Sequence, residues 1–465
     1  MPIVNKTKNT AAIYNRGREV VKVYDHGKLA WQKQSSIPDY LCFTALEAGT
    51  FTLTIPAAVT SDNLTYVEYS LNGLNWTRLT VDDTAQSITT PVIHVGGTVY
   101  WRGQGARTTG LSANAANCSR FSSDDGNGNG IEFNLSGCIF SLLTGDNLDT
   151  QGVGSYTFCH LFNSTYVVDA SEMYFNDGTA FGRECREMFR NCTHLAKAPL
   201  LSHASLGSYS YYQMFIGCTN LSYVKCLATD ISATNCLNNW LNGVSSTGTF
   251  IQASGVTWPR GASGIPTGWV DIEKRTMPQG YKQLLQVTSN GTAYIQLSFG
   301  FEETDEVAAT FSVDTSQTTD KYIVCPQTWN NNSNRYGMGV HNYGQYTAAF
   351  GNRSTGNTIL TPRTSNNGEL HNWTYAAATF AVTDKSCSIN ITGYTFGGIT
   401  TNLRLFYGYN SNTKGAISSY KHIKGSTTAC DFVAAVRESD NTAGLYDLAN
   451  DEFVTCNGLT AGEEI

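Results

Sequence analysis

Charged side chains are scarce in this sequence. They make up 14% of its 465 residues, against about 25% in ordinary soluble domains. The 30 basic residues do not outnumber the 37 acidic ones, and the net charge is −7. The chain therefore lacks the basic surface with which proteins hold nucleic acid or anionic lipid, and we expect neither as a partner.

Long apolar runs are missing as well. No stretch approaches the roughly 18 uninterrupted apolar residues of a membrane span, and the beginning, MPIVNKTKNTAAIYNRGREVV, has no apolar core of signal-peptide length. We therefore expect that the chain is made in the cytosol and does not insert into a membrane. The 13 cysteines are odd in number, and in a reducing compartment they are expected to be free thiols buried as small hydrophobes.

Motifs of catalysis and cofactor binding are also absent from the sequence. There is no Gly-x-Ser-x-Gly elbow, and GNGNG at 126–130 lacks the Lys and Ser or Thr of a phosphate-binding loop. The histidines never stand at metal-binding spacings such as His-x-x-x-His; they occupy positions 26, 94, 160, 194, 203, 341, 371 and 422. We expect no catalytic residues, no metal and no cofactor.

Glycine and aromatic residues are abundant, with 44 Gly, 25 Tyr and 21 Phe, which is typical of β-sheets joined by tight turns. We predict a mostly β chain. Residues 1–36 are predicted to form an N-terminal anchoring arm, because the hairpin pattern EVVKVYDHGKLAW at 19–31 turns at Asp25-His26-Gly27 and needs something to pack on.

Residues 37–110 are predicted to form a small antiparallel Ig-like β-sandwich. The runs LCFTAL, TFTLTI, TYVEYSL and TVYWRG alternate apolar and polar residues between turn clusters. One hairpin, YSLNGLNW at 69–76, is similar to the Ser-x-Asp-x-Gly-x-x-Trp hairpin of sialidases but has Asn for Asp and is one residue short. The preference of Asn72-Gly73 for a tight turn explains this hairpin without any relation to sialidases.

Residues 111–271 contain an internal repeat. MFRNCTHL at 188–195 and MFIGCTNL at 214–221 are nearly the same, and the pairs Leu161-Phe162, Met188-Phe189, Met214-Phe215 and Trp240-Leu241 follow one another at steps of 27, 26 and 26 residues. Apolar residues at fixed offsets in such a period predict a leucine-rich-repeat solenoid. Residues 131–158 are expected to begin it and residues 249–270 to close it.

The runs MFRNCTHLAKAPLL, MFIGCTNLSYVKCLATDISA and GIPTGWV resemble the BspA-type leucine-rich repeats of gut Bacteroides and of the crAss-like tailed phages that infect them. The resemblance covers roughly residues 130–271. The first coil, LFNSTYVV, departs from the pattern because it lacks the cysteine after the apolar pair.

Residues 272–465 are predicted to form a large jelly-roll sandwich, since strand-like runs follow one another at sandwich spacing. The closing stretch at 431–458 resembles the end of the concanavalin-like, laminin-G-like domains of phage head and tail appendages. The residues that carry this resemblance are Asp431, Phe432, Val436, Gly444, Leu445, Tyr446, Asp447, Phe453 and Gly458.

Two local patterns are candidate metal sites. Asp125, Asn127, Asn129 and Gly130 match the first half of a calcium loop, but its twelfth position is Ser136, which offers no bidentate carboxylate. We favour a glycine loop over a calcium site. Cys192 and His194 are neighbours, but His194 corresponds to Asn220 in the next coil, so a buried structural cysteine is favoured over a metal or nucleophile pair.

Two other patterns concern sugars. Glu302, Glu303, Asp305 and Glu306 do not reproduce the Glu-x-Asp-x-Glu motif of the endoglucanases related to the concanavalin-like fold, so we expect a solvated turn rather than a glycosidase pair. The stretch WNNNSNRYGMGVHNYGQY at 329–346 is rich in groups that stack on and hydrogen-bond to sugars. A polar loop at a subunit interface explains it equally well.

The resemblances imply a non-enzymatic virion protein: a head-fibre or tail-fibre component of a tailed phage, located in the virion. Its arm would bind other virion proteins, its outer domains would contact host or mucus glycans, and such appendages are usually homotrimers. The alternative is a secreted or cell-surface bacterial adhesin for host matrix or glycans. A glycan-degrading enzyme is a third possibility that lacks its carboxylates.

Overall fold

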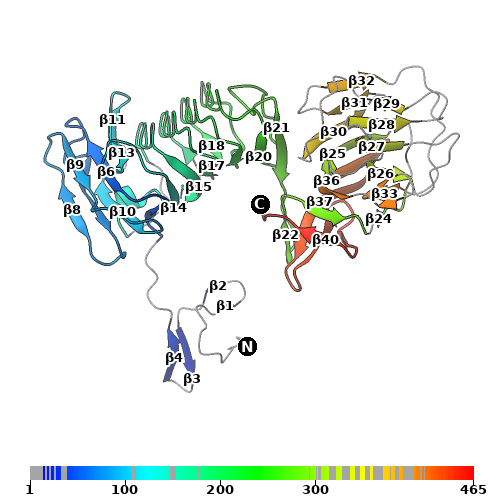
Figure 1. The fold of residues 1–465 in the computed structure, drawn as a ribbon, viewed down its shortest axis with the longest axis horizontal. Helices are drawn as coiled ribbons and strands as arrows, with labels where there is room; N and C mark the ends of the chain where they lie inside the picture. The colour runs from blue at the N-terminus through cyan, green and yellow to red at the C-terminus, as the bar shows by residue number, and fades with distance from the viewer. Residues whose placement is uncertain are drawn as a thin grey trace.

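The computed structural model describes four short N-terminal strands and then residues 39–465, with gaps at 107–109, 147–152, 176–178, 293, 300, 302–304, 314–320, 327–335, 341–345, 351–356, 360–369, 377–378, 383–386, 391–402, 409–410 and 413. Nearly every regular element is a strand, which confirms the mostly β prediction (Figure 1). The described residues contain one α-helix, α1 (Ser141–Thr144), and no helix there is long and apolar enough to span a bilayer.

The N-terminal strands form two small antiparallel pairs. They are β1 (Tyr14–Asn15) with β2 (Arg18–Glu19), and β3 (Lys22–Asp25) with β4 (Lys28–Gln32). The second pair is the hairpin predicted at 19–31. Neither pair joins a sheet of the other described strands.

The predicted sandwich and the predicted solenoid share one ten-stranded sheet (Figure 1). Its order is β21 (Trp269–Lys274), β20 (Gly248–Ala253), β19 (Tyr223–Cys226), β17 (Lys197–Leu201), β15 (Val167–Tyr174), β14 (Phe133–Cys138), β5 (Leu41–Ala45), β10 (Thr98–Gly105), β7 (Leu64–Ser70) and β8 (Thr77–Thr80).

The strands from β14 to β21 are parallel, as successive coils of a solenoid require, whereas β14 pairs antiparallel with β5. A single hydrophobic core runs from Leu41 to Trp269. The boundary expected at residue 110 thus separates an antiparallel sandwich from a parallel solenoid, but both parts share one hydrophobic core. The sandwich strand β5 covers the edge that the first solenoid strand would otherwise expose.

Smaller sheets complete this part of the chain. A three-stranded sheet packs opposite the sandwich strands, and two pairs lie in connecting segments. The three-stranded sheet consists of β13 (Arg120–Asp124), β6 (Thr50–Ile55) and β9 (Gln86–Thr89). The two pairs are β11 (Ser112–Asn114) with β12 (Asn117–Cys118), and β16 (Thr179–Ala180) with β18 (Ser205–Leu206).

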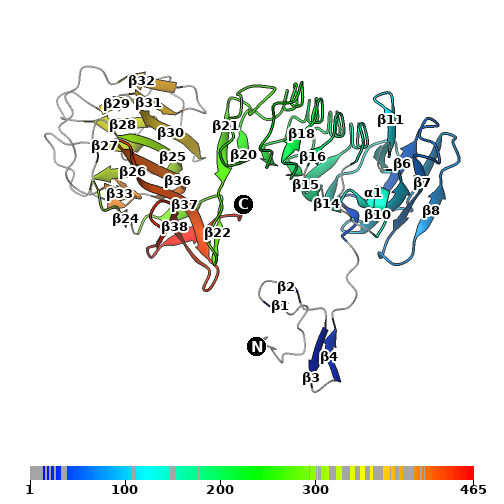
Figure 2. The ribbon, with the colours of Figure 1, turned by 180° about the vertical axis from the view of Figure 1, so that it is seen from behind.

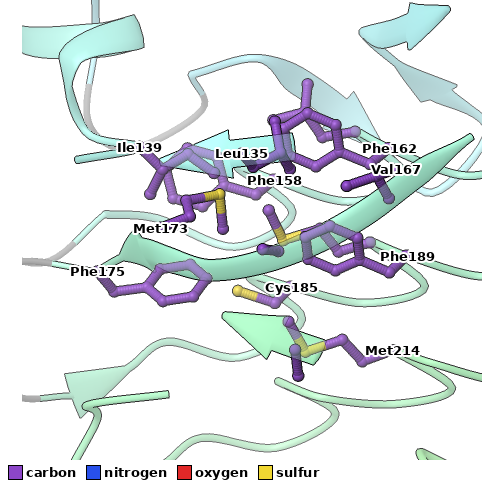
Figure 3. Packing of buried hydrophobic residues seen from close by; sticks show 14 of the residues in the cluster. Leu135, Ile139, Phe158, Phe162, Val167, Met173, Phe175, Cys185, Phe189 and Met214 are labelled. Atoms are coloured by element: carbon purple, nitrogen blue, oxygen red, sulfur yellow. The ribbon is translucent and has the colours of Figure 1, made fainter. Parts of the chain in front are cut away.

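The coil interior explains the repeated letters. The rings of Phe121, Phe162, Phe189 and Phe215 form a stack in which successive centroids lie 5.4, 5.2 and 5.5 Å apart and planes differ by 12 to 15°. Met188 and Met214 are fully buried members of the same core cluster, and Figure 3 shows Met214 in this core with Phe162 and Phe189. The Met-Phe pair of each repeat is therefore the filling of one coil.

The turns of the coils place every fourth residue in the left-handed backbone region. These residues form three rows at the same offset in successive coils: 156, 183, 209 and 235; 160, 187, 213 and 239; 164, 191, 217 and 243. Alternate amides of these turns, those of the left-handed residues included, bond to the next coil, as from Glu187 N to Tyr212 O (2.9 Å) and from Phe189 N to Met214 O (2.9 Å). The rows repeat the 27- and 26-residue steps of the sequence.

The C-terminal part is a sandwich of two antiparallel sheets. The larger comprises β32 (Cys387–Asn390), β31 (Thr379–Val382), β30 (His371–Ala376), β25 (Glu306–Val313), β36 (Lys414–Lys424), β37 (Thr427–Arg437), β38 (Thr442–Asp447) and β39 (Glu452–Val454), joined by β22 (Tyr281–Gln283), β23 (Val287–Asn290) and β40 (Leu459–Ala461).

The smaller sheet comprises β24 (Ile295–Gln296), β33 (Leu403–Leu405), β26 (Lys321–Pro326), β27 (Tyr336–Val340), β28 (Tyr346–Phe350) and β29 (Asn357–Ile359). A separate pair is β34 (Tyr407–Gly408) with β35 (Ser411–Asn412). Core residues from both large sheets, such as Phe311 and Leu405, belong to one hydrophobic cluster.

The C-terminal sandwich adjoins the last coil of the solenoid (Figure 2). Ile251, Val270 and Ile272 on the outer face of β20 and β21 pack with Ile465. Asn372 Nδ2 on β30 donates a 2.7 Å hydrogen bond to Asp271 Oδ1 on β21. Strand β21, the last strand of the solenoid, is thus covered by apolar and polar contacts with the C-terminal sandwich.

Candidate functional site

Cys192 and His194 point in different directions. Cys192 is fully buried, and its thiol donates a 2.9 Å hydrogen bond to the carbonyl oxygen of Phe162. The imidazole Nδ1 of His194 lies 2.7 Å from Glu132 Oε1, and its ring packs on Tyr166. The structure does not bring the two side chains together as a metal or nucleophile pair, and Cys192 has the structural role we favoured.

The other described cysteines are also free, and all but Cys456 are buried, as predicted. Burial raises the pKa of the Cys226 thiol to about 12 and that of Cys42 to about 11. These two thiols stay protonated at neutral pH, so neither provides the thiolate that a nucleophile or metal ligand needs.

The Asp125 loop is closed by its own hydrogen bonds. Asp125 Oδ1 accepts from the backbone N–H groups of Asn127 (2.7 Å) and Asn129 (3.2 Å). Asp125 Oδ2 accepts from the side-chain amides of the same two residues. The Asn129 side chain contributes most to lowering the pKa of Asp125 to about 2. In the described part of the chain, no group of three or more His, Cys, Asp or Glu side chains could hold a metal ion.

Asp305 corrects one sequence-based prediction. Glu302 and Glu303 lie outside the described residues, but Asp305 is only 1% exposed and is not on a solvated turn. Its Oδ2 is 2.8 Å from His422 Nε2 and 3.2 Å from Lys424 Nζ. For Asp305 the prediction was wrong, because this residue immediately precedes β25, which packs against β36, the strand that carries both partners. Glu306, the first residue of β25, is exposed as predicted.

The Asp305–His422 pair continues to Tyr420, whose hydroxyl lies 2.9 Å from His422 Nδ1. Burial lowers the pKa of His422. A second sealed network joins His203 to Tyr211 (Nδ1 to OH, 2.5 Å) and to Glu184 (Nε2 to Oε1, 3.8 Å), all fully buried. A substrate could not reach the buried acid and base groups of either network. We therefore assign both networks a structural role, in which they connect neighbouring strands and coils.

A cavity of about 590 Å³ lies where the last coils meet β22. Its walls carry apolar groups such as Leu227, Met277 and Tyr281 together with three cations. The cations are bound by the chain's own oxygens: Lys274 Nζ to Ile465 O (2.8 Å), Arg275 Nη2 to Asp431 Oδ2 (2.6 Å) and Lys282 Nζ to Glu464 Oε2 (3.0 Å). This cavity therefore belongs to the junction between the two units.

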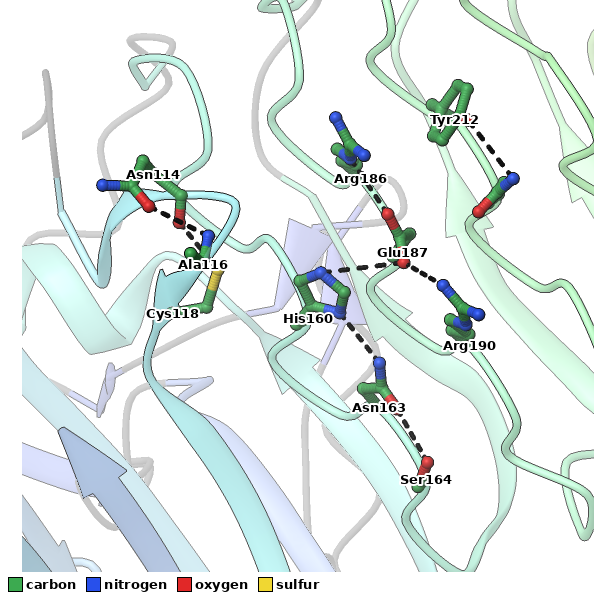
Figure 4. A network of polar contacts seen from close by, with 11 residues as sticks. Asn114, Ala116, Cys118, His160, Asn163, Ser164, Arg186, Glu187, Arg190 and Tyr212 are labelled. Carbon is green, nitrogen blue, oxygen red and sulfur yellow. Dashed lines mark hydrogen bonds and ion pairs between the residues drawn. The ribbon is translucent and has the colours of Figure 1, made fainter. Parts of the chain in front are cut away.

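The outer face of the coil turns carries a polar network around Glu187 (Figure 4). Glu187 Oε1 accepts from Arg186 Nε (3.0 Å), and Oε2 accepts from Arg190 Nη1 (2.5 Å) and lies 3.7 Å from His160 Nε2. Burial acts to raise the pKa of Glu187, but the bonds from Arg190 and Arg186 outweigh it and the pKa is lowered. Burial lowers the pKa of His160.

The neighbouring row on this face consists of Tyr156, Arg183 and Tyr209. The guanidinium carbon of Arg183 lies 5.6 Å from the ring centroid of Tyr156 and 5.1 Å from that of Tyr209. Arg186 packs similarly on Tyr212, at 4.7 Å. Aromatic rings beside cationic and hydroxyl groups can bind sugars and anions, so we take this row as the candidate binding site.

The sequence contained a signal for this row. Each member stands five residues before the first apolar residue of its repeat pair, as Arg183 stands before Met188. The sugar-binding stretch predicted at 329–346 lies in part outside the described residues, and its side chains are not described on β27 and β28. That prediction stays a prediction.

No family model and no curated protein matches the chain. Among solved structures, it is similar to domains LG4-5 of the mouse laminin alpha1 chain, with 8% sequence identity and a TM-score of 0.26, over 92% of this chain and 94% of that one. A similarity this low transfers neither a fold nor a function.

Proposed function

We propose that this chain is a non-enzymatic display protein, a surface appendage of a tailed phage, that contacts host-surface or mucus glycans. The observation that carries the binding role is the row of Tyr156, Arg183 and Tyr209 on the outer face of the coils. The buried acid and base groups support it too, because Asp305, His422 and Tyr420 are enclosed in the core. A rigid β scaffold holds such side chains at fixed spacing.

The virion location is supported by the repeat residues, which resemble those of phage-borne BspA-type proteins. The β3–β4 hairpin supports an anchoring arm, because it does not pair with the other described strands and has main-chain groups available for a partner. In this proposal, copies of the chain on one particle add weak contacts into useful avidity.

Binding is tested with the full chain on an array of mucin-type and host-surface glycans. Labelled protein should bind a subset of glycans, and the binding should be stronger for chemically cross-linked multimers than for single chains. Incubation with the bound glycans should release no reducing ends. Binding to no glycan at all, or release of cleaved sugar, would contradict the proposal.

The alternative is a bacterial adhesin that uses the same face. Antibodies against the C-terminal sandwich discriminate the two. Labelling of phage particles in infected cultures supports the appendage, whereas labelling of the surface of uninfected bacteria supports the adhesin.

A further inference from the structure

The row of Tyr156, Arg183 and Tyr209 occupies backbone positions that disfavour these residue types. Their φ angles are +68, +64 and +60°, and Asn235, at the same position in the next coil, has +53°. Left-handed φ disfavours residues with a Cβ, and Gly and Asn tolerate it best. The third row follows this rule at Asn191, Gly217 and Gly243 but not at Ser164. The second row departs from it at His160, Glu187 and Gln213, and there Glu187 forms ion pairs with Arg186 and Arg190.

Bulky side chains at such positions indicate that something other than backbone stability placed them there. The backbone is held by the coil ladder, in which Arg183 N donates to Ser208 O (3.0 Å) and Tyr209 N donates to Thr234 O (3.1 Å). The three side chains are partly exposed. They therefore form a fixed row in which a guanidinium is flanked by two phenol rings.

Arg183 also differs from the neighbouring arginines in its partners. Arg186 and Arg190 both bond to Glu187. For Arg183, the described residues provide two ring contacts and no carboxylate or hydrogen-bond acceptor for the guanidinium. Its planar set of N–H donors, which matches an oxyanion in two-point fashion, is thus available to a ligand.

We propose that Arg183 is the anion-recognition group of a site for acidic sugars, those that carry a carboxylate or a sulfate ester. Tyr156 and Tyr209 would pack on the apolar face of the ring and bond to its hydroxyls. Because the whole chain has a net charge of −7, an acidic ligand needs such a local cation to approach. This inference rests on the glycan-binding role proposed above and names its ligand class.

The test measures binding of the full chain to polymer-linked sialyllactose, sulfated N-acetyllactosamine and neutral lactose. Wild type should bind one or both acidic probes about tenfold or more better than lactose, and less as salt is raised. Arg183→Asn should bind the acidic probes no better than lactose. It should unfold at the same or a higher temperature, because Asn suits this backbone position.

The controls separate recognition from general charge and from folding. Arg437→Asn removes the same charge from a partly exposed arginine that pairs with Asp440, and it should leave binding unchanged. Arg183→Lys keeps the charge but loses the two-point donor set, and it should bind the acidic probes at least several-fold more weakly.

Three outcomes would overturn the acidic-sugar site: unchanged acidic binding by Arg183→Asn, equal loss in Arg437→Asn, or no acidic preference in wild type. If wild type binds neutral glycans equally well, the proposed function survives and this inference fails. If it binds no glycan, both fail. A response to only the sialyl or only the sulfated probe identifies which anion the site takes.

Discussion

The thiol of Cys218 donates a 3.0 Å hydrogen bond to the backbone carbonyl oxygen of Phe189, in the preceding coil. One coil earlier, Cys192 makes the same bond to Phe162 (2.9 Å). In these two repeats, the cysteine after the apolar pair thus connects its coil to the aromatic stack of the coil before it. This bond explains why the motif places Cys three residues after Phe.

Replacing Cys218 with Ala should therefore destabilise the solenoid. The change removes one buried hydrogen bond and leaves a small cavity, and we expect a loss of about 1–2 kcal/mol in the free energy of unfolding. Denaturant titration measures it. Thr219→Ala, at the exposed neighbouring position, should change stability by about 0.5 kcal/mol or less. Equal effects of the two changes would mean that the thiol bond contributes nothing.

Phe189→Ala should be the more damaging change, because Phe189 is fully buried between the rings of Phe162 and Phe215. A deleted core phenylalanine costs about 3–5 kcal/mol. The matched control is Phe181→Ala on the same coil, where the side chain is 44% exposed and we expect a change near zero. Calorimetric unfolding of both variants decides the matter. A small effect at Phe189 would count against the stack as the coil filling.

His160 should make the solenoid less stable in mild acid. Its pKa in the folded chain is lowered by burial, so below about pH 6.5 the unfolded chain binds the proton more readily than the folded one. Stability is then lost as pH falls from about 6.5 through the lower folded pKa. At higher pH both states are neutral at this site and it has no effect.

His160→Asn removes that proton-binding group and suits its left-handed backbone, as Asn239 does in a later coil. The melting temperature of this variant should fall less between pH 7 and pH 5 than that of wild type. If the melting temperatures of wild type and variant fall equally over this pH interval, His160 does not contribute to the acid sensitivity.

Deleting residues 1–34 should abolish incorporation of the chain into phage particles if the arm is its anchor. The melting temperature of the remainder should not change, because β1 to β4 pair with no other described strand. Immunoblots of purified particles compare the deletion with the full chain. Normal incorporation would remove the anchoring role.

The homotrimer stays a prediction by analogy with fibre appendages. Light scattering coupled to size-exclusion chromatography should give a mass of three chains. A monomer mass at micromolar concentration would contradict it, and the arm deletion shows whether trimerisation depends on residues 1–34.

The period of the solenoid was available from the sequence, because its cause is local. A coil can bury Leu, Met and Phe only at fixed offsets, so Met188-Phe189 and Met214-Phe215 reappear at the same step. The hairpin at Asp25 and the burial of Cys192 followed from equally local patterns. The sequence alone therefore determined the β class, the repeat and the burial of Cys192.

Contacts between distant residues were decided only by the tertiary structure. Asp305 and His422 are far apart in the chain, and antiparallel pairing of β25 with β36 brings them together. The union of β5 with β14 in one sheet likewise depends on which edge strands meet. The row of Tyr156, Arg183 and Tyr209 became a candidate site only when their backbone angles and ring distances were known. A repeat specifies which residues share an offset, but stacking of the coils decides which of them face solvent together.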